Sequence, residues 1–176
     1  MPLEHALLVS LRERRGSGLE LARRFDRSIG FFWSATHQQI YKVLHRMEAA
    51  GWVGSEAVAQ RGRPDKVVYT VTRGGRAELA RWVAEPTRSE GFRSELAVKM
   101  RGASYGDRDA LLRDLTDRVA GHRARLEHYE SLRERDYPDP GRLSGQELDQ
   151  YLVLRGGMLM EQFWTQWLTE YLEAHA

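Results

Sequence analysis

The sequence predicts a mainly α-helical protein with a two-stranded hairpin in its first half and long helices in its second half. Apolar residues recur at helical spacing along most of the 176 residues. Between residues 52 and 72 the pattern changes to the alternation of strands, with a turn rich in arginine and glycine in the middle. Beyond residue 107 two long helical segments flank a break at residues 136–141, which holds two prolines. These observations predict a small hairpin-containing domain followed by a purely helical one.

The composition excludes several classes of protein. The chain has no cysteine and no run of about 18 apolar residues, so we expect neither disulfides nor a membrane partner. Basic residues follow the N-terminal apolar run rather than precede it, unlike a secretory signal, so we expect a cytoplasmic, nucleoid-associated protein. Residues 1–90 hold 15 Lys and Arg against 10 Asp and Glu, whereas residues 91–176 hold 12 against 15. The more basic first half is the one expected to meet a polyanion.

Two helices are predicted before residue 28. The first begins at Pro2, and its apolar side carries Leu3, Ala6, Leu7, Val9 and Leu11. The second spans residues 18–27, since Ser17 and Glu20 have the spacing of a capping box. Its expected core residues are Leu19, Ala22 and Phe25. A connector at 28–33 then leads to a third helix.

The third helix, after a cap at Ser34 or Thr36 and before the stop at Gly51, has the most informative pattern in the chain. Its core face is formed by Ile40, Val43, Leu44 and Met47, at the spacing i, i+3, i+4, i+7. The opposite side carries Gln38, Lys42 and His45, flanked by Gln39, Tyr41 and Arg46. The only acid of the helix, Glu48, lies near its end. Such a face suits reading of base edges in a major groove, and an ordinary solvated amphipathic helix is the alternative.

A hairpin and a fourth helix complete the first domain. Strands are predicted at 52–60 and 66–72 around a basic turn at 61–65, and Thr72 caps a helix at 74–85 that Pro86 ends. Leu79, Trp82 and Val83 are expected to point inward. This element order is that of a winged helix-turn-helix domain, with the turn as the wing; a solvated loop is the alternative. The residues expected to contact double-stranded DNA are Thr36, His37, Gln38, Gln39, Tyr41, Lys42, His45, Arg46, Arg61, Arg63 and Lys66.

The second domain, residues 87–176, is predicted to be a helical dimerisation domain, after a winged-helix domain at 1–86. Helices are expected at 92–103, 107–135 and 145–174, the last opened by a capping box of Ser144 and Glu147. The apolar band on this last helix is broader than one partner helix can cover, which predicts a homodimer. The expected dimer contacts are Leu115, Val119, Leu126, Leu148, Leu152, Leu159, Phe163, Trp167 and Tyr171.

Over residues 4–84 the chain resembles the PadR family of bacterial transcriptional regulators, in its longer form. The resemblance rests on segments 6–8, 20–22, 40–51, 61–64 and 69–76, and continues more weakly through 95–99. It implies a homodimeric repressor that binds a palindromic promoter site and is usually released by a small molecule. The recognition-helix tyrosine of the family maps to Tyr41, and its wing residues map to Arg63 and Pro64. Many members carry His-Gly-Tyr where this chain has Ser17-Gly18-Leu19, so a backbone contact of that tyrosine is not expected here.

The resemblance and the aromatic residues Phe163, Trp164 and Trp167 together predict a pocket for a flat aromatic effector, and a plain dimer core is the alternative for these side chains. No histidine pair has the spacing of a metal site, and no phosphate loop or catalytic triad is evident, so no metal, no cofactor and no enzyme activity are expected. A protein-binding winged helix and a transcriptional activator remain alternative functions.

Overall fold

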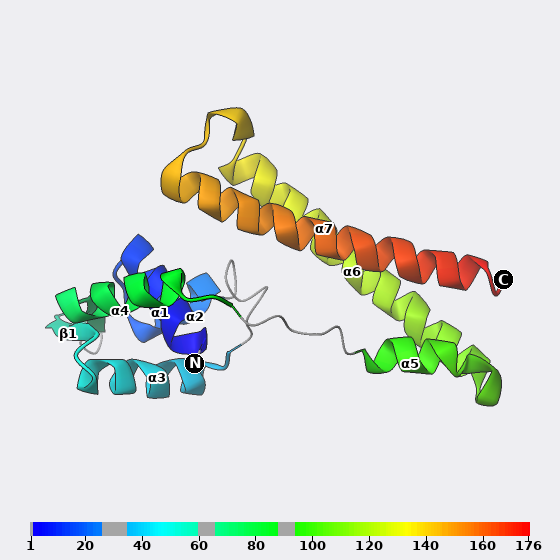
Figure 1. The fold of residues 1–176 in the computed structure, drawn as a ribbon, viewed down its shortest axis with the longest axis horizontal. Helices are drawn as coiled ribbons and strands as arrows, with labels where there is room; N and C mark the ends of the chain where they lie inside the picture. The colour runs from blue at the N-terminus through cyan, green and yellow to red at the C-terminus, as the bar shows by residue number, and fades with distance from the viewer. Residues whose placement is uncertain (1, 26–34, 60–65, 88–93) are drawn as a thin grey trace. The chain divides into compact units, whose positions relative to one another are not determined.

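A computed structural model of the chain describes residues 2–25, 35–59, 66–87 and 94–176. The chain divides into two compact units, Met1–Ser89 and Glu90–Ala176, each with its own hydrophobic core. The predicted fold class is confirmed: the first unit combines helices with one hairpin, and the second is built on two long helices (Figure 1).

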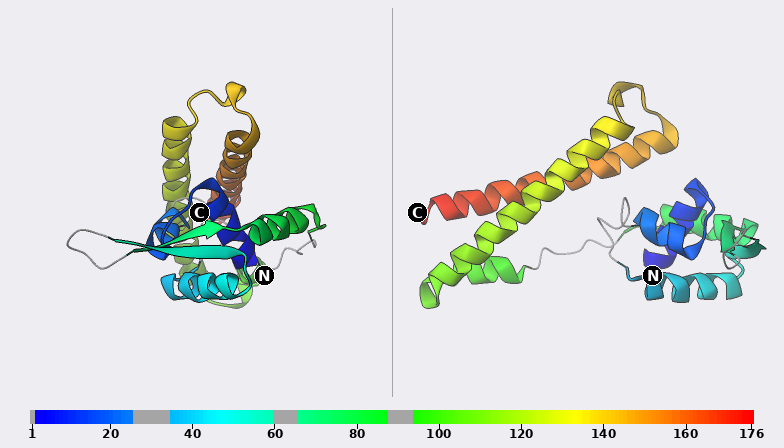
Figure 2. Two further views of the ribbon diagram at one scale, coloured as in Figure 1. Left: turned by 90° about the vertical axis from the view of Figure 1, so that its left-hand side faces the viewer. Right: turned by 180° about the vertical axis from the view of Figure 1, so that it is seen from behind.

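The first unit has the order of a winged helix-turn-helix domain. Its elements are α1 (Pro2–Glu13), α2 (Gly18–Phe25), α3 (His37–Ala49), β1 (Val53–Val58), β2 (Lys66–Val71) and α4 (Arg73–Ala84). The two strands are antiparallel, with Val53 opposite Val71, and lie side by side in Figure 2. Gly16, between α1 and α2, exchanges two backbone hydrogen bonds with Tyr69 of β2. The segment between the first two helices therefore pairs with β2 through a single antiparallel bridge.

The core of this unit holds α3 in place. The side chains that form it are Leu7, Leu8, Leu11, Leu21, Ala22, Ile40, Val43, Leu44, Met47, Val53 and Tyr69. Two residues that were predicted to point into the core are exposed instead. Leu19 is 42% exposed because Leu21, on the opposite side of α2, faces the core instead. Val83 is 68% exposed because α4 directs Gly75 and the half-buried Leu79 and Trp82 inward.

Two local features fix where α3 ends and α4 begins. Gly51 has a φ of 71°, and its N–H and that of Trp52 donate to the last carbonyls of α3, as in a glycine C-cap. Thr72 accepts a hydrogen bond from Gly75 N and caps α4. A Cβ at Gly75 would lie 2.0 Å from the Trp52 carbonyl oxygen, so only glycine permits this approach of helix and turn.

A buried histidine joins α1 to α4. The His5 ring stacks on Trp82 with centroids 4.4 Å apart and also lies against Trp52. Its Nε2 is 2.9 Å from Glu78 Oε1. Hydrogen bonds from Arg81 and then from His5 lower the pKa of the Glu78 carboxyl to about 2. The hydrogen bond between His5 and Glu78 therefore lies beside two tryptophan rings and holds α1 against α4.

The second unit is a helical hairpin with a short helix at one end. Its elements are α5 (Glu95–Arg101), η2 (Ala103–Tyr105), α6 (Arg108–Asp136), η3 (Pro140–Arg142) and α7 (Gly145–Glu173). Helices α6 and α7 run side by side in both Figure 1 and Figure 2. The predicted capping box at Ser144 is wrong, because that side chain makes no cap hydrogen bond and Gly145 begins the helix at a φ of 53°.

The core of the second unit joins all three α-helices. Met100 of α5, Leu115 and Val119 of α6, and Leu168 of α7 are buried together. The Tyr171 hydroxyl donates to the Met100 carbonyl oxygen over 2.8 Å and secures α5 against α7. Within the described parts of the chain, no helix has the length and apolar character needed to cross a bilayer.

Candidate nucleic-acid interface

The outer face of α3 is open to solvent, as the sequence predicted. Its exposed side chains are His37, Gln38, Gln39, Tyr41, Lys42, His45 and Arg46. The one acid on the helix, Glu48, accepts a hydrogen bond from Ser55 and lies 4.0 Å from His45 Nδ1. The carboxylate is thus held at the C-terminal end of α3, away from the polar side chains of the first two turns. That part of the helix offers donors and positive charge without a competing acid.

The first turn of α3 is fixed by a reciprocal cap. Thr36 Oγ1 accepts from Gln39 N at 3.2 Å, and Gln39 Oε1 accepts from Thr36 N at 2.8 Å. The cap predicted at Ser34 or Thr36 is thereby confirmed at Thr36. Gln39, predicted only to contact DNA, has a second task in this cap that the sequence prediction did not assign to it. The cap leaves the Gln39 amide NH2 unused, whereas Gln38 takes no part in it.

Arg46 connects α3 to α1. Its Nη2 is 2.5 Å from Glu4 Oε1, and the Glu4 side chain is only 12% exposed. A charge-assisted bond to a poorly solvated carboxylate fixes the guanidinium more firmly than a surface pair would. We therefore assign Arg46 to the positioning of α3, and its predicted DNA contact stays a prediction.

The described part of the wing is also fixed by an ion pair. Lys66 Nζ, at the start of β2, is 2.5 Å from Glu20 Oε1 in α2. Glu20 also accepts from Ser17 N at 2.8 Å, which confirms the predicted capping box. The hydrogen bonds from Lys66 and from the Ser17 backbone lower the pKa of the Glu20 carboxyl from 4.5 to about 2. Arg61 and Arg63, the other predicted wing contacts, lie outside the described residues.

The sequence prediction missed these ion pairs because their partners lie far apart along the chain. Arg24 of α2 makes a further contact that the prediction missed: its guanidinium donates hydrogen bonds to the backbone carbonyl oxygens of Ser10 and Arg14 at the end of α1. Burial lowers the pKa of its guanidinium. Periodicity finds the buried face of a helix but carries no information about which carbonyl a distant arginine will meet.

The predicted dimer residues fall into two groups. Leu115 and Val119 are buried in the core of their own unit, Trp167 and Tyr171 pack partly against that core, and Leu126 and Leu148 are half-buried. Leu152, Leu159 and Phe163, by contrast, are 50–54% exposed on α7. Val153 and Met160 are similarly exposed, and Gly156 between them has open space at its Cα. The apolar stripe at residues 152–163 of α7, formed by Leu152, Val153, Leu159, Met160 and Phe163, is exposed within the described residues of the second unit.

The predicted effector residues form a compact aromatic cluster. Ring centroids of Phe163, Trp164 and Trp167 lie 5.4–5.8 Å apart. Trp164 also stacks on His122 of α6, whose Nδ1 is 2.5 Å from Glu161 Oε2. The polar pair of His122 and Glu161 therefore lies next to the three aromatic rings.

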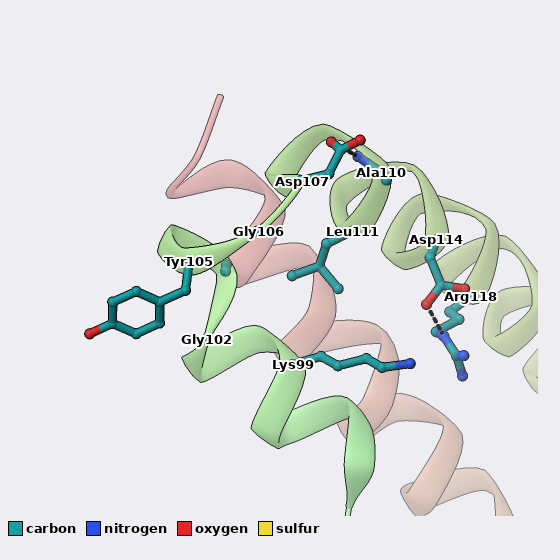
Figure 3. Close-up of a pocket in the computed structure, with 10 residues that line it drawn as sticks. Lys99, Gly102, Tyr105, Gly106, Asp107, Ala110, Leu111, Asp114 and Arg118 are labelled. Carbon is teal, nitrogen blue, oxygen red and sulfur yellow. Dashed lines mark hydrogen bonds and ion pairs between the residues drawn. The ribbon is translucent and has the colours of Figure 1, made fainter.

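Two surface hollows of the second unit lie elsewhere. One of about 540 Å³ lies between α5, η2 and the start of α6 (Figure 3). Leu111 lies between the two helices, Lys99 extends alongside it, and Tyr105, 92% exposed, points outward. The other, about 400 Å³, lies between α6 and α7 and is lined by Leu126, Thr165 and Thr169 among others. Neither is lined by Phe163, Trp164 or Trp167.

A winged helix-turn-helix unit with such a third helix, followed by a unit of long helices, defines a DNA-binding transcriptional regulator. The chain belongs to the PadR-like family of transcriptional regulators, whose family model matches residues 7–81. Residues 92–176 match the family described as virulence activator alpha C-term. The resemblance found in the sequence is thereby confirmed, as is the expectation that the chain is not an enzyme.

Relatives with known names cover almost the whole chain. The Mycobacterium tuberculosis protein described as "Probable transcriptional regulator Rv1176c" is 50% identical over 99% of this chain and 97% of its own. The Vibrio cholerae virulence activator AphA has a similar structure, with a TM-score of 0.80, 31% identity and 99% coverage of both chains. Bacillus subtilis PadR in complex with operator DNA gives a TM-score of 0.85 at 27% identity, with 99% coverage of both chains. That PadR is described as a negative transcriptional regulator, and it has also been solved with p-coumaric acid.

Proposed function

We propose that this protein is a homodimeric repressor that binds a palindromic promoter operator and is released by a small aromatic compound. The observation that carries the proposal is the outer face of α3. Gln38, Tyr41 and Lys42 are exposed on a helix whose start, end and depth are fixed by caps and core packing. An exposed polar helix on a rigid frame is what insertion into a major groove requires.

The proposed readout divides the DNA-contacting residues by their chemistry. Gln38 and Tyr41 can exchange hydrogen bonds with base edges, whereas Lys42 and His37 suit phosphates or guanine. Arg61, Arg63 and Lys66 on the wing are proposed to meet the backbone or the neighbouring minor groove. Lys66 would do so only in exchange for its bond to Glu20. The structure of B. subtilis PadR in complex with operator DNA supports operator binding as the proposed task of this fold.

The proposed dimer uses the apolar stripe at residues 152–163 of α7. A single recognition helix reads one half-site, and two half-sites about 34 Å apart need two copies. The stripe presents Leu152, Leu159 and Phe163 around Gly156, so another helix could approach closely at the glycine. Leu115 and Val119 are buried with Leu168 in the core of their own unit, so they are not proposed to touch the partner.

The proposed effector is a planar aromatic acid or phenol, and the proposed site is the cluster of Phe163, Trp164 and Trp167. Tryptophan faces bind planar rings, and the His122–Glu161 pair next to them supplies polar groups for a hydroxyl or carboxyl substituent. The p-coumaric acid complex of B. subtilis PadR supports the ligand class.

The sign of regulation is proposed as repression, with activation as the second candidate. B. subtilis PadR is described as a negative regulator, whereas the C-terminal unit matches the family of virulence activators. An operator that overlaps the promoter blocks polymerase, and one upstream can recruit it. We further propose a cytoplasmic location, where the DNA of a bacterium lies.

Selection of bound sites from random DNA with the full-length protein tests this function. We expect a palindrome with half-sites one helical turn apart, or a multiple of one turn. Transcription from a promoter bearing that palindrome, with and without the protein, then gives the sign. Recovery of no common sequence, together with capture of a protein partner through α3, would instead favour the protein-binding alternative.

A further inference from the structure

The ring of Tyr41 lies directly over the first residue of α2. A Cβ built on Gly18 would be 2.4 Å from Tyr41 Cε1 and 2.7 Å from Tyr41 Cζ. Carbon atoms that are not bonded prefer separations of about 3.5–4.0 Å. The Tyr41 ring therefore occupies the space that any side chain at position 18 would need.

The backbone of α2 gives no reason for a glycine at this position. In the described parts of the chain, a positive φ occurs at Gly51 and Gly145, and not at Gly18. An alanine could adopt the conformation of Gly18 and would favour the helix. The ring of Tyr41 is thus the feature of the structure that excludes a side chain here.

We propose that Gly18 is a positioning residue for DNA readout: by lacking a side chain, it lets the Tyr41 ring lie against the start of α2 and so sets where the Tyr41 hydroxyl points. Tyr41 is 42% exposed, so the ring rests on α2 while part of it stays open to a ligand. This inference rests on the proposed function, in which Tyr41 contacts DNA. It makes base preference depend on a residue of α2 that need not touch the DNA.

A side chain at Gly18 would redirect the ring rather than unfold the protein. The atoms in its way belong to the end of a partly exposed side chain, which can rotate. Gly75 is the contrasting case, because there the obstructing atom is a backbone carbonyl oxygen at 2.0 Å. Gly54 has no obstructing atom nearer than 4.0 Å and serves as a matched control.

The test compares the full-length variants Gly18→Ala, Tyr41→Ala, their double variant and Gly54→Ala on the operator selected by the wild type. We expect Gly18→Ala and Tyr41→Ala each to weaken operator binding about tenfold, the size of one polar contact. The double variant should bind no more weakly than Tyr41→Ala, since both changes remove the same contact. Gly54→Ala should bind as the wild type does, and the melting temperature of Gly18→Ala should be within a few degrees of the wild type.

A second readout follows the ring without DNA. In protein labelled with 3-fluorotyrosine, the ¹⁹F resonance lost in Tyr41→Phe identifies Tyr41, and we expect Gly18→Ala to shift it. Wild-type operator affinity in Gly18→Ala alongside weakened binding in Tyr41→Ala would overturn the inference, as would additive losses in the double variant or unfolding of Gly18→Ala. Wild-type binding by Tyr41→Ala would instead show that the proposed function is wrong about Tyr41, and the inference would fall with it.

Discussion

Lys66 of β2 and Glu20 of α2 form an ion pair, with 2.5 Å between Nζ and Oε1, that joins residues 46 positions apart. The pair ties the turn end of the hairpin, where Lys66 lies opposite Val58, to the same turn of α2 on which the Tyr41 ring rests at Gly18. Both the wing, through Lys66, and α3, through Tyr41, therefore contact the first turn of α2. A change in α2 is expected to alter how both meet DNA.

The Glu20 carboxylate should contribute stability that depends on pH. Its pKa in the folded protein is about 2, below the ordinary value of 4.5, so the contribution is fully present above about pH 4.5 and is lost as the pH falls toward 2. Glu20 is 45% exposed, and solvent screening limits the effect to about 1 kcal/mol or less. We expect Glu20→Gln to lower the free energy of unfolding by that amount at pH 7, in urea titrations.

The same titrations at lower pH provide the control. The difference between Glu20→Gln and the wild type should shrink below pH 4.5, because the carboxyl is protonated first in the unfolded chain and near pH 2 in the folded protein as well. Glu95→Gln, which removes a more exposed pair with Lys99, should show no measurable difference at either pH. A Glu20→Gln effect that does not change with pH would contradict the assignment.

Neutralising the wing should weaken DNA binding in a salt-dependent way. If Arg63 contacts one phosphate, Arg63→Gln should reduce the slope of log K against log[salt] by about one per subunit. Lys66→Gln should reduce the slope by less, since Lys66 already neutralises Glu20, and should lower stability as Glu20→Gln does. Equal slopes for the wild type and both variants would mean that the wing does not meet the DNA.

A charge in the apolar stripe should break the dimer without unfolding the chain. Leu159 is 50% exposed on α7, so Leu159→Glu costs the single chain little. Light scattering should report twice 20.3 kDa for the wild type and 20.3 kDa for the variant, with unchanged helical circular dichroism. Operator affinity should fall by about 10²-fold or more, because two linked half-sites become one. Gln146→Glu, also exposed on α7, should stay dimeric; a dimeric Leu159→Glu would place the interface elsewhere.

The fold followed from local sequence patterns because each element depends mostly on its own residues. The spacing of Ile40, Val43, Leu44 and Met47 predicted the buried face of α3 correctly, and Gly51 predicted its end. Leu19 and Val83 were misplaced because, at the edge of a helical face, the packing partner decides which neighbour is buried. That partner comes from another part of the chain.

The candidate site could be predicted only in outline. Exposure of the outer face of α3 followed from periodicity, but the tasks of individual residues did not. The capping box of Thr36 and Gln39 has the same local spacing as that of Ser17 and Glu20, and the prediction overlooked the part of Gln39 in it. Arg46, by contrast, bonds to Glu4, 42 positions away. The contact between Gly18 and the Tyr41 ring could not be predicted, because a glycine has no side chain and adds nothing to the hydrophobic pattern of α2. Such pairings depend on tertiary distances that a sequence does not display.

Gln38 should determine base preference, and Arg46 should not. Gln38 is exposed and takes no part in the α3 cap, so we expect Gln38→Ala to lose about 1–3 kcal/mol of discrimination at one position of each half-site. Arg46→Gln should lower the melting temperature through the lost bond to Glu4, yet leave base preference unchanged. Competition binding with single-base operator variants measures both. Unchanged preference in Gln38→Ala would move the readout to another residue of α3.

An aromatic acid should bind the cluster of Phe163, Trp164 and Trp167 and release the operator. Release requires that the ligand bind the DNA-free protein more tightly than the complex, since equal affinity for both shifts nothing. With p-coumaric acid as the probe, we expect tryptophan fluorescence to be quenched over the same concentrations that dissociate the operator. The stacking of Trp164 on His122 makes that tryptophan the expected reporter.

The double variant Trp164→Leu, Trp167→Leu should lose both effects, whereas Tyr105→Ala, at the hollow of Figure 3, should keep them. The reverse result would move the ligand from the aromatic cluster to that hollow.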